Sequence, residues 1–232
     1  MIKTASIIRK SNSWKELFDT CKSLSNKEKG DVYEHVVKLY LQTHSEYRTK
    51  LSEVWLLNEV PAKVKRKLNL PDSDNGIDLI AETRDGTYWA IQAKYRKNKN
   101  KPLALVEDHL TSFTNLAFVN CKNIEFGLIC ATTITPAKKE KLLGTKVGFC
   151  RYSEFAALDD NDCEGWKRLK SALTKAPKAP KKLSPRPHQI RAIKNAKEHF
   201  ITSKNSRGKM IMPCGTGKSL TGFWIAQTFE AK

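Results

Sequence analysis

The chain has 232 residues, 40% of them hydrophobic, and its 42 Lys and Arg against 24 Asp and Glu give a formal net charge of +18. That hydrophobic content supports a globular core and excludes wholesale disorder. The charge indicates a polyanionic partner: nucleic acid is the first candidate, an anionic membrane surface the second, and a charge that serves only solubility the third. No segment approaches the roughly 20 apolar residues that span a bilayer, so we expect no membrane contact.

The cysteines and the N-terminal residues bear on the cellular compartment. The chain has six cysteines. None lies in a C-x-x-C pair or precedes a His at a zinc-finger spacing, so we expect neither structural zinc nor a disulfide scaffold. The first residues lack an apolar run of signal-peptide length. We therefore expect reduced thiols and a cytoplasmic location.

The first part of the chain predicts helices and one strand. Apolar residues at helical spacing predict helices over residues 13–24 and 26–43, the first of them capped by Ser13. A short apolar run at 54–57 predicts a strand. The basic stretch 61–70 predicts a short helix or a loop.

The middle of the chain predicts the sheet. Two strand-like runs, residues 76–83 and 87–95, flank the turn sequence Arg84-Asp85-Gly86. Further elements are predicted as a helix over 105–118, a strand over 124–131, a helix over 135–143 and a strand over 147–152. This mixture predicts an α/β fold with a central mixed sheet flanked by helices.

The last part of the chain differs in composition. In residues 174–185, TKAPKAPKKLSP, Pro and Lys alternate with Ala without an apolar stripe, which predicts a stiff, extended linker. Helices are predicted over 187–201 and 217–229, with a short strand over 209–212 between them. The two domains are therefore expected at residues 1–173 and 186–232.

The predicted hairpin places three polar residues in an apolar setting. Because residues two apart in a strand share a face, Gln92 and Lys94 project together. A three-residue loop, Arg84-Asp85-Gly86, would bring Asp78 opposite Gln92, whereas a two-residue turn would shift the register by one and pair Asp78 with Ala93. A carboxylate, an amide oxygen and an ammonium group together suit metal-dependent phosphodiester hydrolysis. The alternative is three ordinary polar side chains on a solvated strand face.

This segment resembles the Mrr-like branch of the PD-(D/E)XK nuclease superfamily, over roughly residues 10–170. The first strand carries D-x-G-x-D as Asp74-Asn75-Gly76-Ile77-Asp78, and the second carries Q-x-K as Gln92-Ala93-Lys94. The resemblance implies a restriction-endonuclease-like core in which Asp78, Gln92 and Glu34 bind Mg²⁺ or Mn²⁺. Lys94 would assist catalysis, and Asp74 would be a further participant.

The roles of two of these residues, Gln92 and Glu34, can also be interpreted in another way. Gln92 departs from the wider superfamily because it is neutral, so metal affinity would rest on Asp78, Glu34 and backbone carbonyl groups. This keeps open a DNA-binding module that no longer cuts. For Glu34 the alternative is a surface ion pair with Lys38, one helical turn away.

A second motif lies in residues 212–219, MPCGTGKS, between a predicted strand and a predicted helix, which is the setting of a phosphate-binding loop. It resembles motif I of superfamily 2 helicases and translocases, although Met212 replaces the first Gly. Upstream, Gln189 in RPHQ resembles the Gln that contacts adenine in those proteins. The candidate nucleotide-binding residues are Gln189, Gly215, Thr216, Gly217, Lys218 and Ser219. The resemblance implies the truncated start of a RecA-like helicase domain, so that ATP would be bound and hydrolysed only by a longer protein.

Basic clusters at residues 63–67, 94–101 and 175–182 predict contacts to a nucleic-acid backbone with little sequence preference. Four side chains of the second cluster would hold phosphates beside the scissile one: Arg96, Lys97, Lys99 and Lys101. A nuclease followed by a motor resembles the single-polypeptide type ISP restriction-modification enzymes. That resemblance implies an endonuclease acting on double-stranded DNA, of which two copies meet to cut both strands. The alternatives are a catalytically degenerate DNA-binding module and a repair or junction-resolving nuclease.

Overall fold

The computed structural model describes residues 2–71, 76–106, 108–135, 146–174, 183–213 and 215–229. The chain forms two compact units, residues 1–180 and 181–232. The division falls inside the predicted linker. Linker residues 175–182 lie outside the described residues, so the linker and the domain limits that depend on it stay predictions. Within the described residues, no helix combines the length and the apolar character that crossing a membrane requires.

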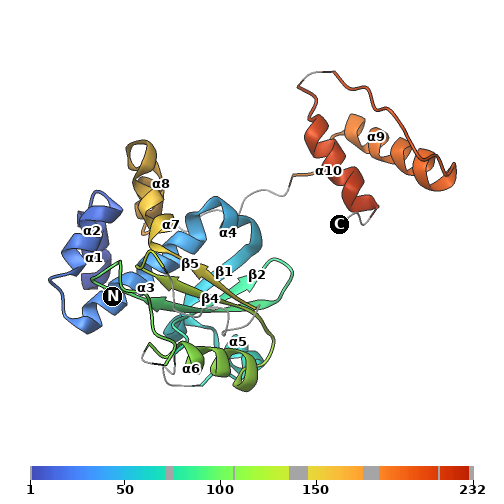
Figure 1. Ribbon diagram of the computed structural model, residues 1–232. Coiled ribbons are helices and arrows are strands. Elements are labelled where there is room, and N and C mark those ends of the chain that lie inside the picture. The colour runs from blue at the N-terminus through green and yellow to red at the C-terminus, as the bar shows by residue number, and fades with distance from the viewer. Residues whose placement is uncertain are drawn as a thin grey trace. The chain divides into compact units, whose positions relative to one another are not determined.

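The first unit is built on a mixed five-stranded sheet with the strand order β1-β2-β3-β4-β5 (Figure 1). The strands are β1 (Leu51–Leu56), β2 (Leu79–Thr83), β3 (Tyr88–Lys94), β4 (Ile124–Ala131) and β5 (Val147–Cys150). β2 pairs antiparallel with both β1 and β3, whereas β4 pairs parallel with β3 and β5 pairs parallel with β4. One end of the sheet therefore collects the last residues of β1, β3, β4 and β5 and the first residues of β2. The predicted central mixed sheet is confirmed.

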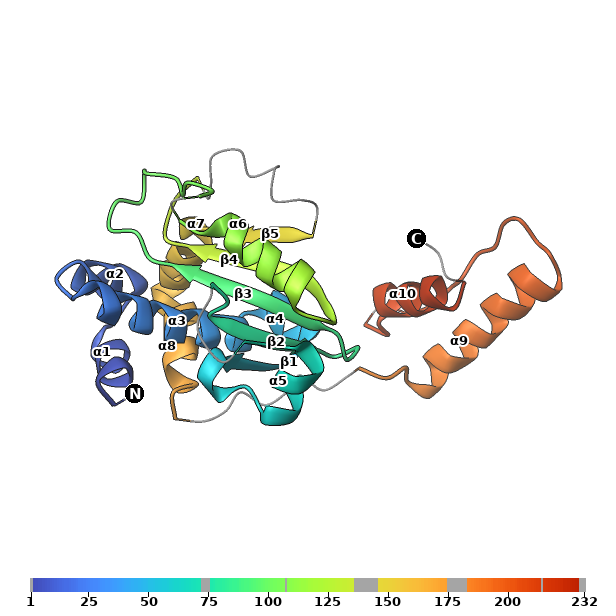
Figure 2. The same ribbon diagram turned by 90° about the horizontal axis from the view of Figure 1, so that it is seen from below.

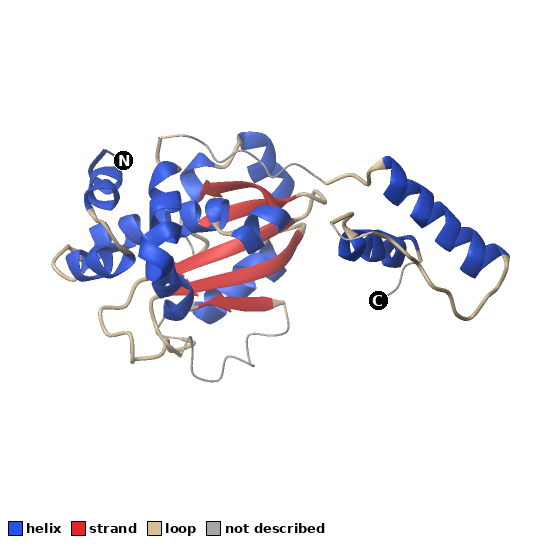
Figure 3. Ribbon diagram, turned by 90° about the horizontal axis from the view of Figure 1, so that it is seen from above, coloured by secondary structure: helices blue, strands red, loops and turns tan. Residues whose placement is uncertain are grey.

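Helices cover both faces of this sheet (Figures 2 and 3). The larger core involves α1 (Ile2–Lys10), α2 (Trp14–Cys21), α3 (Asn26–Thr43), α4 (Ser45–Lys50), α7 (Tyr152–Ala156) and α8 (Asp160–Ser171). The smaller core involves α5 (Ala62–Leu68) and α6 (Leu110–Asn115). Strand residues alternate between the two cores, with Ile91 in the larger and Ala90 in the smaller. Because β3 lies at the centre, both of its faces are covered.

The β2–β3 hairpin has the three-residue loop that the active-site interpretation requires. Leu79 pairs with Ile91, and the pairing continues toward the turn. The Thr83 N–H donates to the Thr87 carbonyl at 2.9 Å, and the Gly86 N–H donates to the Thr83 carbonyl at 3.1 Å. Gly86 has φ +80°, a conformation that glycine adopts without strain. The predicted register is confirmed, and it places Asp78 beside the end of β3.

Several predicted elements differ in the structure. The helix expected over 105–118 begins only at Leu110, because Asp108 accepts a hydrogen bond from the Ala104 N–H at 2.6 Å and His109 has φ +58°. This side-chain contact competes with the helical bonds of the first turn. The strand expected over 147–152 ends at Cys150, since Tyr152 already starts α7. Residues 136–145, and with them most of the helix expected over 135–143, lie outside the described residues.

The second unit contains α9 (Pro187–Lys197), a π-helical turn over Glu198–Thr202, and α10 (Lys218–Thr228). Both predicted helices are confirmed, and Pro187 starts α9 at the position where its missing N–H costs no bond. The strand expected over 209–212 is wrong, because those residues have no strand conformation. The described part of this unit offers no second strand with which their backbone groups could pair.

Candidate active site at the end of the sheet

Asp78 is held by both neighbouring strands at the end of the sheet. Its N–H donates to the Ile91 carbonyl at 2.9 Å, and its carbonyl accepts from the Leu57 N–H at 2.9 Å. Its carboxylate oxygen Oδ2 accepts from the Ala93 N–H at 2.6 Å. The side chain is partly buried. These contacts fix the carboxylate against the segment of β3 that carries Gln92 and Lys94.

Gln92 is completely buried, with 0% exposure. Neither its Oε1 nor its Nε2 has a hydrogen-bond partner among the described residues. A buried amide without partners costs free energy that a purely structural residue would avoid. Gly76, at φ +109°, lies beside it, and a Cβ at this position would be 3.4 Å from Gln92 Nε2. The Gln92 amide is therefore a buried polar group whose hydrogen-bonding capacity the described residues do not use.

Lys94 is the last residue of β3 and pairs with Ala131 of β4. Its ammonium group has no hydrogen bond or ion pair among the described residues. Beyond it the chain is held by Thr132, whose N–H donates to the Lys94 carbonyl at 3.2 Å. The Thr132 Oγ1 accepts from the Arg96 N–H at 2.6 Å and donates to the Arg96 carbonyl at 2.9 Å. Thr132 thus fixes the backbone around Lys94.

Glu34 projects from α3 and lines a cleft of about 450 Å³ together with Asp78. The alternative ion pair between Glu34 and Lys38 is not formed, because Lys38 pairs with Glu59 instead. Two carboxylates that the sequence separates by 44 positions (78 − 34) are thereby brought to one cavity. This pairing is what the resemblance implied for Glu34.

The donor set fits a magnesium ion. Asp78 and Glu34 supply carboxylate oxygens to the cleft, and Gln92, which the hairpin register places opposite Asp78, has a buried amide without a partner among the described residues. In the part of the chain that the structure describes, no three His, Cys, Asp or Glu residues form a metal-binding group. Mg²⁺ does not need such a cage, since it keeps several waters and uses one or two carboxylates with substrate phosphates. Asp74, the further predicted participant, lies outside the described residues.

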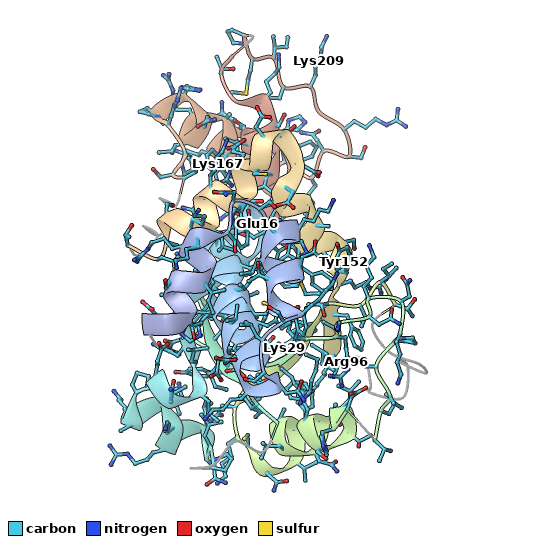
Figure 4. All side chains as sticks on the ribbon, turned by 90° about the vertical axis from the view of Figure 1, so that its left-hand side faces the viewer. Glu16, Lys29, Arg96, Tyr152, Lys167 and Lys209 are labelled. Carbon is cyan, nitrogen blue, oxygen red and sulfur yellow. The ribbon has the colours of Figure 1, made fainter. Side chains whose placement is uncertain are left out.

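The basic segment after Lys94 needs a correction. Arg96 forms an ion pair with Asp108, and the Lys99 Nζ lies over the Tyr152 ring at 4.6 Å from its centre (Figure 4 labels Arg96 and Tyr152). These two side chains hold the loop in place instead of standing free for phosphates. Lys97 and Lys101 are exposed, as expected of phosphate contacts.

The structure gathers the candidate nucleotide-binding residues around the loop before α10. Gly215 and Gly217 have φ +75° and +80°, and Lys218 starts the helix. Gln189 is buried at 2% exposure, and its Nε2 donates to the Thr216 carbonyl at 3.2 Å and to the Gly217 carbonyl at 3.4 Å. Ser219, in the first turn of α10, is exposed. The upstream Gln motif and the loop are therefore in direct contact.

Sequence reasoning missed the contribution of Thr132. No local pattern marks it, because its role depends on the parallel pairing of β3 with β4. The one usable signal was its position directly after a buried strand whose last residue must lie beside Lys94.

Comparison with known proteins gives two family matches. A family model described as "Restriction endonuclease" matches residues 42–160, just over half of the chain. A second, described as "Type III restriction enzyme, res subunit", matches residues 182–232. No curated protein matches. A solved structure described as "ATP-dependent Type ISP restriction-modification enzyme LlaBIII bound to DNA" is similar at 25% identity and a TM-score of 0.49. The similarity covers 94% of this chain and 13% of that one.

Proposed function

Because the chain belongs to the restriction endonuclease family, we propose that its first unit is a Mg²⁺-dependent endonuclease that hydrolyses phosphodiester bonds of double-stranded DNA. The observation that carries this proposal is the shared cleft of Asp78 and Glu34, beside the buried and unpaired Gln92. Oxygen donors of this kind would bind Mg²⁺ or Mn²⁺. Such an ion, when bound, polarises a phosphate and lowers the pKa of its bound water.

The protein's own groups would position the reaction. Asp78 and Glu34 hold negative charge in the cleft, and the Ala93 N–H keeps the Asp78 carboxylate in one orientation. The Lys94 ammonium group would donate to the phosphate oxygens, where negative charge grows in the transition state. Thr132 supports this role because it bonds the Lys94 carbonyl and the backbone of Arg96 just after the lysine. Asp74, which precedes Asp78 in the motif, is proposed as a supporting carboxylate.

The second unit would belong to a motor. Gln189 and residues 215–219 would bind ATP, with Lys218 reaching the terminal phosphates and Ser219 holding Mg²⁺. The whole protein would couple DNA translocation to cleavage, and two copies would meet to cut both strands. The match of residues 182–232 to a restriction-enzyme res subunit supports this arrangement.

Cleavage of supercoiled plasmid DNA tests the nuclease proposal. The purified protein is expected to nick or linearise the plasmid in Mg²⁺ or Mn²⁺ and to be inactive in EDTA. The Asp78→Ala variant is expected to bind DNA without cutting it. An Asp85→Ala variant, which changes an exposed carboxylate in the hairpin turn, is the matched control and keeps activity. Metal-independent cutting, or equal cutting by Asp78→Ala, would contradict the proposal.

A second function is kept open by the neutrality of Gln92. A motif with a neutral Gln92 in place of an acidic residue binds metal less tightly, which suits a DNA-binding module without cleavage. Wild-type protein that binds duplex DNA and fails to cut in either metal supports this module. A preference for branched over linear duplexes in the same assay would instead favour a repair or junction-resolving nuclease.

A further inference from the structure

The cleft that Asp78 and Glu34 line also contains hydrogen-bond donors that the proposed metal chemistry does not use. They are Asn58 in the 3₁₀ turn Leu57–Glu59 and Lys65 on α5. They come from two different elements. The fold therefore brings donors and carboxylates to the same cavity.

The elements that carry these donors are tied together. Glu59 accepts from the Leu56 N–H at 3.1 Å and forms an ion pair with Lys38 of α3. This places the 3₁₀ turn against the helix that carries Glu34 and His35. Lys65 lies in the second turn of α5, where its N–H donates to the Pro61 carbonyl at 2.9 Å. The walls of the cleft are thus set before any ligand binds.

The donors are available to a ligand. The side chains of Lys65 and Asn58 have no hydrogen-bond or ionic partner among the described residues. His35 is not among these donors: its Nδ1 lies 2.7 Å from the Asp31 carbonyl, to which it can only donate, so Nε2 of the neutral ring is an acceptor. Lys65 therefore places an ammonium group without a described partner in a cleft that three carboxylates also line.

Charge indicates the ligand. The lining carries three carboxylates, Asp31, Glu34 and Asp78, and one ammonium group, Lys65. A single divalent cation would bring the net charge of these four groups to zero. A phosphate that enters the cleft would then accept hydrogen bonds from the donors that do not contact the cation. The volume of about 450 Å³ is roughly fifteen times the ~30 Å³ share of one water, which accommodates a hydrated ion and a phosphate.

We propose that Lys65, with Asn58, binds the non-bridging oxygens of the phosphodiester next to the scissile one on the same DNA strand. This inference rests on the proposed nuclease function for the identity of the neighbouring phosphate. Among the basic residues of α5, only Lys65 lines the cleft. Lys63, on the same helix, is exposed and does not line the cleft.

Binding of a fluorescent DNA duplex in Ca²⁺, and separately in EDTA, tests the assignment without any cleavage. Lys65→Gln is expected to weaken binding about five- to tenfold and to lower the slope of log Kd against log salt by about 0.9, the loss of one phosphate contact. Lys65→Arg keeps the charge and restores most of the affinity. Lys63→Gln is the matched control and is expected to change binding less than twofold. Equal losses for Lys63→Gln and Lys65→Gln would overturn the proposal, since the effect would then be one of total charge.

Cleavage kinetics separate this inference from the nuclease proposal. If wild-type protein cuts DNA, the effect of Lys65→Gln is expected mainly on KM, because the contact is to a phosphate that does not react. A loss confined to kcat would overturn the assignment and leave the nuclease proposal standing. If wild-type protein does not cut, selective loss of binding in Lys65→Gln still supports the phosphate site while the nuclease proposal fails.

Discussion

The Asp78 carboxylate accepts a hydrogen bond from the Ala93 N–H at 2.6 Å, so the first residues of β2 are joined to the middle residue of the Gln92-Ala93-Lys94 sequence. The contact exists because the hairpin has a three-residue loop and the register that follows from it. Asp78 thus has two separable roles, one as an acceptor for a backbone N–H and one as a negative charge in the cleft.

Substitution of Asp78 separates these roles. Asp78→Asn keeps an oxygen that can accept from the Ala93 N–H and removes the charge, whereas Asp78→Ala removes both. We expect each variant to lose at least about a hundredfold in cleavage, because metal binding contributes several kcal/mol to the reaction. Only Asp78→Ala should lower the free energy of unfolding, by about 1–2 kcal/mol. Urea unfolding and plasmid cleavage measure the two effects. Near-normal cutting by Asp78→Asn would exclude a metal-binding role for this carboxylate.

We expect the buried amide of Gln92 to lower the free energy of unfolding and to be required for metal-dependent cleavage. Replacing it with Met keeps a similar volume and removes two buried polar atoms that have no partner among the described residues. We expect Gln92→Met to be neutral or up to about 1 kcal/mol more stable than the wild type and to lose metal-dependent cleavage. Thermal unfolding with the cleavage assay measures this. A destabilised variant with intact cleavage would show that the amide serves the fold instead.

Thr132 and Thr133 form a matched pair, since both are fully buried and adjacent in sequence. Thr132 bonds the Arg96 N–H and carbonyl, whereas the Thr133 hydroxyl has no partner among the described residues. Thr132→Val should lose about 1–3 kcal/mol of stability and reduce kcat, because it leaves the Arg96 N–H without its partner and frees the backbone beside Lys94. Thr133→Val should be neutral or slightly stabilising. Equal effects of the two substitutions on kcat would rule out a positioning role for Thr132.

Glu59 gives the first unit an acid-sensitive contact. Burial alone would raise its pKa, but the hydrogen bonds from Lys38 and the Leu56 N–H and the charge of Lys38 outweigh burial and lower the pKa below its ordinary value of 4.5. A carboxylate with a lowered folded-state pKa stabilises the fold above its ordinary pKa, and this contribution disappears as pH falls through the folded-state value. Wild type should therefore be about 1 kcal/mol more stable than Glu59→Gln at neutral pH, with a gap that closes below pH 4.5.

The control for that pH series is Glu164→Gln. Glu164 pairs with Arg168 on α8, and its side chain is 67% exposed. An exposed pair of this kind contributes little, so the variant should stay within about 0.5 kcal/mol of the wild type at each pH. A gap for Glu59→Gln that persists unchanged in acid would mean that its carboxylate charge is not what stabilises the contact.

The sequence by itself indicated most of the helices and strands of the first unit. The Arg84-Asp85-Gly86 turn allowed a two- or a three-residue loop, the active-site interpretation favoured the three-residue loop, and the structure has the register of that loop. Turn chemistry and alternation are properties of neighbouring residues, which is why they can be recognised without a fold. The spacing of apolar residues likewise predicted α3, which carries Glu34.

Contacts between distant segments were decided only by the tertiary structure. Arg96 was expected to hold a phosphate, yet packing brings Asp108 to it. The strand expected at 209–212 failed because a strand needs a neighbour, which its own residues cannot supply. Lys65 was one of several similar basic residues until the fold placed it in the cleft of Asp78 and Glu34. Which side chains interact depends on which surfaces the sheet and the helices bring within a few ångströms of each other. The spacing of residues along the sequence does not determine that distance.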